Sequence, residues 1–154
     1  MYLKSRLQKV QAHYKALEEY RDAIAETEFD FSPEAFADLK VEQKALLEAY
    51  LKRFASLQDY LGAKVFSALL DRAGISYTKM SEVLSLMEKE GIIDLDRWIE
   101  FRNVRNDLEH DYPDELDDAL EDLRYCFEHF DDLEEIVRRV YAFARSYDET
   151  LRLP

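Results

Sequence analysis

The stretch "RNVRNDLEHDYPD", residues 102–114, gathers residue types that can act on a phosphate group. An Arg guanidinium can hold a phosphate through paired hydrogen bonds, and an imidazole with its ordinary pKa of about 6.5 exchanges protons at neutral pH. An Asn amide can position either group. These are the requirements for metal-free cleavage of RNA, in which a ribose 2′-OH attacks the adjacent phosphate. The candidate residues are Arg102, Arg105, Asn106, His110 and Tyr112.

Helical spacing brings only part of this set together. Arg102 lies four residues before Asn106, and Asn106 lies four residues before His110, so the three share one helix face. Arg105 lies five residues before His110, which is about 140° round an ideal helix. Arg105 and His110 therefore converge only if the helix unwinds near His110, or if two copies of the chain meet across a two-fold axis.

A purely structural interpretation of the same stretch stays open. His and Arg side chains near a helix end can satisfy its last carbonyl groups, and Tyr112 can stack at the turn before Pro113. Spacing alone favours this interpretation over a catalytic one.

Metal chemistry has little support in the sequence. Asp107 and His110 are three residues apart, which is one half of a di-iron pattern, and a complete site needs such an element on two helices. Val10 and Cys126 occupy the corresponding positions before the other two histidines. We therefore expect neither a metal nor a cofactor.

Other reactive side chains are better explained by packing and solvation. Cys126, the sole cysteine, stands next to Phe127 in an apolar stripe, which predicts a core residue rather than a nucleophile. His13 and His129 have no partner at helical spacing. Acidic pairs four residues apart indicate a solvated face; they are Asp117 and Glu121, Asp118 and Asp122, and Asp131 and Glu135.

Composition predicts a single all-helical domain. The chain has 154 residues, 47% of them hydrophobic and 36% charged, with only three Gly and three Pro. No apolar run approaches the roughly 18 residues of a membrane span, and residues 1–10 lack the apolar core of a signal peptide, so we expect a cytoplasmic protein. Of the net charge of −13, residues 113–135 contribute −10, so any contact with nucleic acid must be local and made by a few Arg residues.

Hydrophobic periodicity places the first two helices. Apolar residues recur every three or four positions over residues 2–27, which predicts an amphipathic helix. Ser32 is a candidate N-cap, with Pro33 at the first position of a long second helix that extends to about Ala73. Gly62 lies inside that pattern, and the simplest reason is another helix packed closely over it.

The remaining elements complete an antiparallel arrangement. Thr78 is a candidate N-cap for a short helix over 78–90, and a further helix begins near Leu95 and ends near His110 or Asp111. A last long helix follows from about Asp114. The chain is thus predicted to form an all-α, antiparallel up-and-down four-helix bundle with one short additional helix, as a single domain over 1–154.

The segment "RNDLEHDY", residues 105–112, resembles the Arg-x4-His-x-Tyr motif of the HEPN superfamily, including the Asn that usually follows the Arg. It is most similar to the HepT-like toxins and the related nucleotidyltransferase substrate-binding proteins. The resemblance implies a homodimeric, metal-independent endoribonuclease of a toxin–antitoxin pair, inhibited by a minimal nucleotidyltransferase partner.

The resemblance also implies residue roles. Arg105 would stabilise the phosphate, Asn106 would support the site, and His110 would be the acid–base group. Tyr112 matches the Tyr that the partner adenylylates in some of these pairs. Arg102 lies outside the motif, and its role in holding substrate is inferred from helical spacing. The alternative is a non-catalytic substrate-binding or adaptor subunit of a nucleotidyltransferase.

Overall fold

The computed structural model describes residues 2–111 and 115–148, with the backbone alone described for 109–111. All regular secondary structure in these residues is helical, which confirms the all-α prediction. The elements are α1 (Tyr2–Glu26), α2 (Pro33–Asp38), α3 (Val41–Tyr60), the π-helical turn η1 (Leu61–Val65), α4 (Phe66–Ala73), α5 (Met80–Lys89), α6 (Leu95–Asp111), α7 (Leu116–Glu128) and α8 (Phe130–Tyr147).

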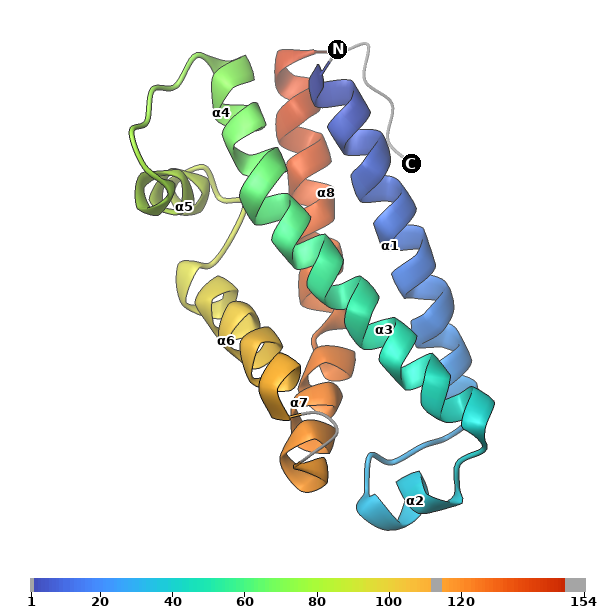
Figure 1. Ribbon diagram of the computed structural model, residues 1–154. Coiled ribbons are helices and arrows are strands. Elements are labelled where there is room, and N and C mark those ends of the chain that lie inside the picture. The colour runs from blue at the N-terminus through green and yellow to red at the C-terminus, as the bar shows by residue number, and fades with distance from the viewer. Residues whose placement is uncertain (1, 112–114, 149–154) are drawn as a thin grey trace.

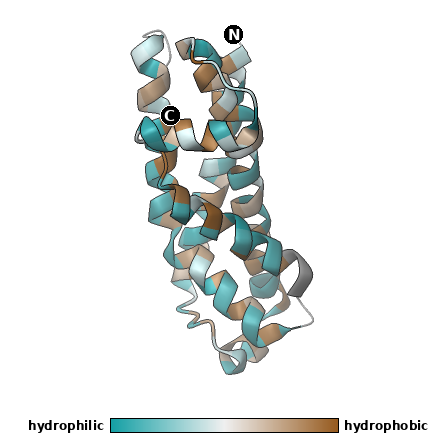
Figure 2. Cartoon of the chain, turned by 90° about the vertical axis from the view of Figure 1, so that its left-hand side faces the viewer, coloured by the Kyte–Doolittle hydropathy of each residue, from teal (hydrophilic) through white to brown (hydrophobic). Residues whose placement is uncertain are grey.

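The long helices lie side by side along one axis. α1 runs down the molecule and packs against α3, which returns through η1 into α4, while α8 lies behind them (Figure 1). α6 and α7 pack against each other beside the lower half of this group (Figure 1). α5 crosses the long helices on the side where α6 also lies (Figure 2). No helix in the described part of the chain is long and apolar enough to cross a membrane.

The buried face of α1 follows the predicted rhythm of three- and four-residue steps. Its buried residues are Leu3, Leu7, Val10, Leu17 and Ile24. Full burial of each such side chain contributes about 1.5–3 kcal/mol, so this face is the main reason why α1 stays on the molecule.

The predicted second helix is broken near its start. Ser32 is the N-cap, and its hydroxyl accepts a hydrogen bond from the Ala35 amide at 3.0 Å, as predicted. The helix nevertheless stops after six residues, because Leu39 and Lys40 are both extended. The Lys40 amide donates to Gln43 Oε1 at 2.8 Å, which starts α3 as a separate helix.

The predicted last helix is also two helices. His129 leaves the helical region (φ −100°, ψ 17°) and separates α7 from α8. Its ring stacks on Tyr125 at a centroid distance of 4.0 Å, and its Nδ1 lies 2.8 Å from the Tyr125 carbonyl oxygen. Tyr125 lies four residues before His129, so the expectation that His129 has no partner at helical spacing is wrong.

The predicted cap of the short helix is wrong by one residue. Lys79 occupies the N-cap position of α5. Thr78 lies outside the helix, where its hydroxyl donates to Glu82 Oε1 at 2.7 Å and its amide donates to Glu82 Oε2 at 3.1 Å. These bonds hold the pKa of Glu82 below its ordinary value.

Close packing over Gly62 is confirmed. Gly62 lies in the π-helical turn, and a Cβ atom at this position would lie 3.1 Å from Cζ2 of Trp98 on α6. The absence of a side chain therefore lets the ring of Trp98 approach the backbone of η1.

Candidate functional site

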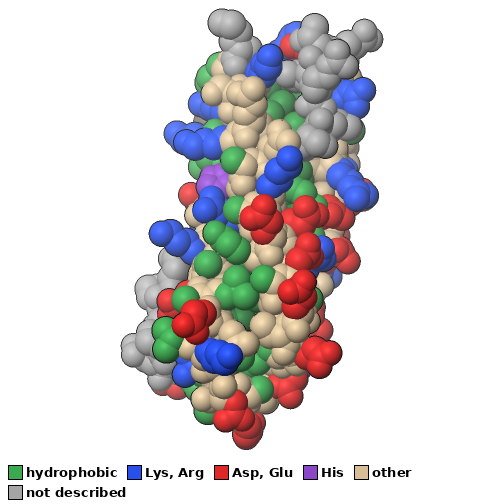
Figure 3. Space-filling model, turned by 90° about the vertical axis from the view of Figure 1, so that its right-hand side faces the viewer, with side chains coloured by type: hydrophobic (Ala, Val, Ile, Leu, Met, Phe, Trp, Pro, Cys, Tyr) green, Lys and Arg blue, Asp and Glu red, His purple; other side chains and the backbone are tan. Residues whose placement is uncertain are grey.

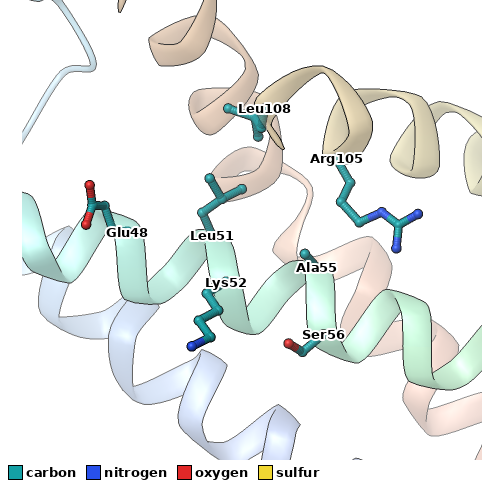
Figure 4. Close-up of a pocket in the computed structure, with 7 residues that line it drawn as sticks. All are labelled: Glu48, Leu51, Lys52, Ala55, Ser56, Arg105 and Leu108. Atoms are coloured by element: carbon teal, nitrogen blue, oxygen red, sulfur yellow. The ribbon is translucent and has the colours of Figure 1, made fainter. Parts of the chain in front are cut away.

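α6 is anchored by one apolar face, and this anchoring fixes the position of its arginines. Trp98, Phe101 and Leu108 are at most 2% exposed. The ring of Trp98 packs against Phe66 at a centroid distance of 5.0 Å. Arg105 projects from this helix toward α3 (Figure 4).

Hydrogen bonds fix the side chain of Arg105 through some of its donors and not through all of them. It is 16% exposed, and its Nη1 donates to Asp59 Oδ1 on α3 at 3.1 Å. Its Nη2 donates to Asn106 Oδ1 at 3.2 Å. Its Nε is buried and has no hydrogen-bond partner among the described residues. The guanidinium thus retains a donor that no described protein group uses.

Two cavities meet at Arg105. One, of about 390 Å³, lies between α3 and α6, and Leu51, Ala55 and Leu108 contribute to its wall (Figure 4). The other, of about 180 Å³, is lined by residues of α3, η1, α5 and α6, and both Arg102 and Arg105 contribute to it. Arg102 is exposed and forms no ion pair with any described carboxylate. Both predicted arginines therefore border the same small cavity.

The structure tests the predicted position of His110 only through the backbone. α6 remains helical through Asp111, so the helix does not unwind before His110. The angle of about 140° between Arg105 and His110 therefore holds within one chain. The side chain of His110 and all of Tyr112 lie outside the described residues.

Asn106 is exposed and contacts Arg105. The expected contact between this amide and the imidazole of His110 stays a prediction. That second contact lies outside the described residues, and the observed hydrogen bond shows that the amide oxygen positions the neighbouring guanidinium.

Cys126 is a core residue, as predicted. It is fully buried, and burial raises the pKa of its thiol well above its ordinary value. The thiolate form that a nucleophile requires is therefore disfavoured. Among the described residues no group of three or more His, Cys, Asp and Glu side chains is placed to hold a metal ion.

The acidic pairs of α7 and α8 are largely solvated, as predicted. Asp117, Glu121, Asp131 and Glu135 are exposed, while Asp122 is half-buried. Glu135 accepts from Arg139 at 3.1 Å.

His13 has a partner that helical spacing did not reveal. Its Nδ1 lies 3.1 Å from Nη1 of Arg53 on α3, and its ring lies beside Tyr60 at a centroid distance of 5.9 Å. Burial, followed by the charges of Arg53 and Lys9, lowers the pKa of His13. Burial thus disfavours the charged imidazolium, and the contact with Arg53 links α1 to α3.

Sequence reasoning missed two residues of the site, Gln58 and Asp59. Asp59 lies 46 residues before Arg105, so no local spacing connects them. Gln58 carried a readable signal: it lies four residues after Phe54 and three before Leu61, at a core register where a polar residue is unusual. It is 3% exposed.

Comparison with family models, curated proteins and solved structures finds no match to this chain.

Proposed function

We propose that this chain is a HEPN-like, metal-independent endoribonuclease toxin of the cytoplasm. In this proposal residues 1–154 form one domain, an up-and-down four-helix bundle with α5 as the additional helix. Arg105 stabilises the scissile phosphate, Asn106 positions Arg105, and His110 transfers protons. Arg102 holds the substrate, and neither a metal nor another cofactor takes part.

The observation that carries the proposal is the unpaired donor on the side chain of Arg105. The side chain is mostly buried beside two cavities, yet its Nε has no partner among the described residues. A buried donor left without a partner is costly, and in native proteins such exceptions mark strain, a catalytic role, or the place of a water or an ion. A phosphate oxygen is a suitable acceptor for a guanidinium.

The geometry of α6 supports a two-fold dimer as the active form. Because α6 is helical through Asp111, the positions of Arg105 and His110 lie about 140° apart around the helix of one chain. Pairing two copies across a two-fold axis brings the Arg of one copy toward the His of the other. We therefore propose that both copies line one cleft.

Basic and acidic side chains are unevenly distributed along the molecule. Residues 2–15 of α1 carry four Lys or Arg residues and no Asp or Glu. On the face that Figure 3 shows, Lys and Arg gather mainly toward the upper end, and Asp and Glu mainly toward the lower end. The candidate site lies on α6, which packs with α7 beside the lower half of the long helices and away from this basic end, so an RNA phosphate at the site has to be held locally by Arg102 and Arg105.

Tyr112 is the proposed point of control. In this proposal a minimal nucleotidyltransferase antitoxin transfers the adenylyl group of ATP to its hydroxyl, which loses its proton as pyrophosphate leaves. The modification adds phosphate charge and bulk two residues beyond His110, which blocks the approach of an RNA phosphate by repulsion.

The test compares the wild-type chain with His110→Ala on total cellular RNA in the presence of EDTA. General acid–base catalysis contributes about 10²–10⁴-fold, so the variant should show almost no cleavage, while wild type remains active without metal. Circular dichroism confirms that both are folded. Equal cleavage by both proteins, or loss of wild-type activity with EDTA, contradicts the proposal.

One observation favours the alternative, an adaptor for a nucleotidyltransferase. Asp59 already neutralises Arg105, which weakens its hold on a phosphate. An adaptor binds the purified nucleotidyltransferase tightly and leaves RNA intact in the same assay. Cleavage that depends on His110 rules this reading out.

A further inference from the structure

The smaller cavity beside Arg105 contains a buried amide without a partner. Gln58 is 3% exposed, lines this cavity, and its Oε1 has no hydrogen-bond partner among the described residues. A buried amide oxygen without a donor is unfavourable for folding. Its place in the cavity wall indicates a ligand that offers a hydrogen-bond donor.

The same cavity presents cationic groups at its edge. Arg102 is exposed, and Arg105 has a buried Nε that no described protein group accepts from. A guanidinium plane stacks on aromatic rings and binds phosphate oxygens. The cavity therefore combines an amide edge with two groups suited to an aromatic, phosphate-bearing ligand.

Apolar side chains complete the wall. Trp98 and Leu84 are buried at the cavity, and Met80 is 46% exposed at it. The volume of about 180 Å³ is well below the roughly 300–1,000 Å³ of a pocket for a drug-sized ligand. The cavity suits one flat ring system and is too small for a whole nucleotide.

We propose that this cavity is a subsite for one unstacked nucleobase, whose hydrogen-bonding edge pairs with the amide of Gln58 while its phosphate lies on Arg102. This inference rests on the proposed function, because the base in the cavity is the one next to the RNA phosphate that Arg105 is proposed to hold. Gln58 accepts an N–H of the base at Oε1. Sequence-specific binding of single-stranded RNA commonly uses such splayed bases, stacked on arginine planes and bound along their edges.

The experiment uses single-stranded 2′-O-methyl RNA hexamers, which lack the free 2′-OH needed for cleavage, so only binding is measured. One hexamer is intact, and the others each carry one abasic position. Affinities are measured for wild type, Gln58→Leu and the matched control Gln8→Leu, which makes the same change on an exposed position of α1. Binding of the four nucleoside monophosphates is measured in parallel.

For wild type and Gln8→Leu we expect one abasic position to weaken binding about tenfold, within the range for one stacked base. Gln58→Leu should bind the intact hexamer about tenfold more weakly and be insensitive to that abasic position. If Gln58→Leu does not fold, Met80→Trp replaces it, because a larger side chain at this half-exposed position fills the cavity without disturbing the core. The same pattern is expected.

The outcomes separate this inference from the proposed function. If the hexamer binds but abasic positions weaken wild type and Gln58→Leu equally, the nucleobase subsite is wrong, while cleavage that depends on His110 still supports the nuclease. If wild type neither binds nor cleaves RNA, and monophosphates bind wild type but not Gln58→Leu, the subsite stands and serves a free nucleotide, while the nuclease proposal fails. If neither the hexamers nor the monophosphates bind, the subsite is overturned.

Discussion

Two buried regions of this molecule differ in whether their polar atoms have hydrogen-bond partners. In the core, the hydroxyl of Tyr50 donates to the Cys126 carbonyl at 2.9 Å, and the hydroxyl of Tyr141 donates to the Leu7 carbonyl at 2.7 Å. Beside α6, Gln58 Oε1 and Arg105 Nε are buried without partners among the described residues.

The difference shows where the fold favours stability and where it retains binding capacity. Both tyrosine bonds join helices distant in the sequence, and one satisfies a carbonyl near the end of α7, where helix geometry leaves carbonyl groups without partners. The two residues that carry these atoms line a single cavity. Each such atom costs about 1–3 kcal/mol of stability, which a bound ligand can recover.

The largest expected effect is the loss of activity in Arg105→Ala. Removal of one group that stabilises the charge of a transition state typically lowers the rate about 10²–10³-fold. Arg105→Lys should recover little, because an ammonium lacks the fork of donors that a guanidinium offers. The measurement is the initial rate of RNA cleavage.

The control for this variant is Arg138→Ala. Arg138 is 70% exposed, and it forms an ion pair with Glu134 at 3.4 Å. This change removes the same charge away from the cavity and should leave cleavage near wild type. Similar losses in both variants would mean that net charge, and not the position of Arg105, determines activity.

The next effect is on stability and contrasts the two regions directly. Tyr50→Phe should lower the free energy of unfolding by about 1–3 kcal/mol, because the Cys126 carbonyl loses its buried donor. Gln58→Leu should leave it unchanged or raise it, since an amide oxygen without a partner is replaced by an apolar group of similar size. Urea denaturation measures both. A large loss in Gln58→Leu would show that its amide is satisfied in solution.

A smaller effect concerns how the free energy of unfolding depends on pH through the imidazole of His13. Its pKa in the fold lies below the ordinary value of 6.5, because of burial and then the charges of Arg53 and Lys9. The unfolded chain therefore binds a proton more readily, so the stability from His13 is full above about pH 6.5 and is lost as pH falls through the lowered pKa.

The measurement for His13 is urea denaturation at a series of pH values from 7 downward. His13→Gln should flatten the decline in the free energy of unfolding, since it removes the titrating group and keeps a polar side chain. An unchanged slope would mean that other groups cause the decline.

Local patterns predicted the all-helical class and several local features of the helices. The α1 stripe, the Ser32 cap and the close approach at Gly62 were all predictable, because each depends on neighbours in sequence or on one residue type. The breaks at Lys40 and His129 were not, because apolar residues continue in register across His129 and resume in register at Leu46 after Lys40.

The candidate site was predictable only in part, for the same reason. The arginines of α6 were identified from residue types in one short stretch. Asp59 and Gln58 come from another helix and reach the cavity only through the packing of α6 on α3. A local pattern cannot report which distant helix supplies the opposite wall.

The smallest expected effect is that of Asp59→Asn. This variant tests whether the ion pair between Asp59 and Arg105 competes with the phosphate or orients the guanidinium. Asp59 is 66% exposed, so the pair contributes at most about 1 kcal/mol to stability. Asn keeps the size of the side chain and an acceptor oxygen, while it removes a negative charge beside the proposed phosphate position. We therefore expect KM for RNA to fall by at most about fivefold, with the gain shrinking at higher salt because screening weakens exposed charges. Asp38→Asn changes net charge equally on α2, away from the cavity, and should leave KM unchanged. If Asp59→Asn instead lowers kcat without changing KM, Asp59 orients Arg105 for catalysis and does not compete with the phosphate.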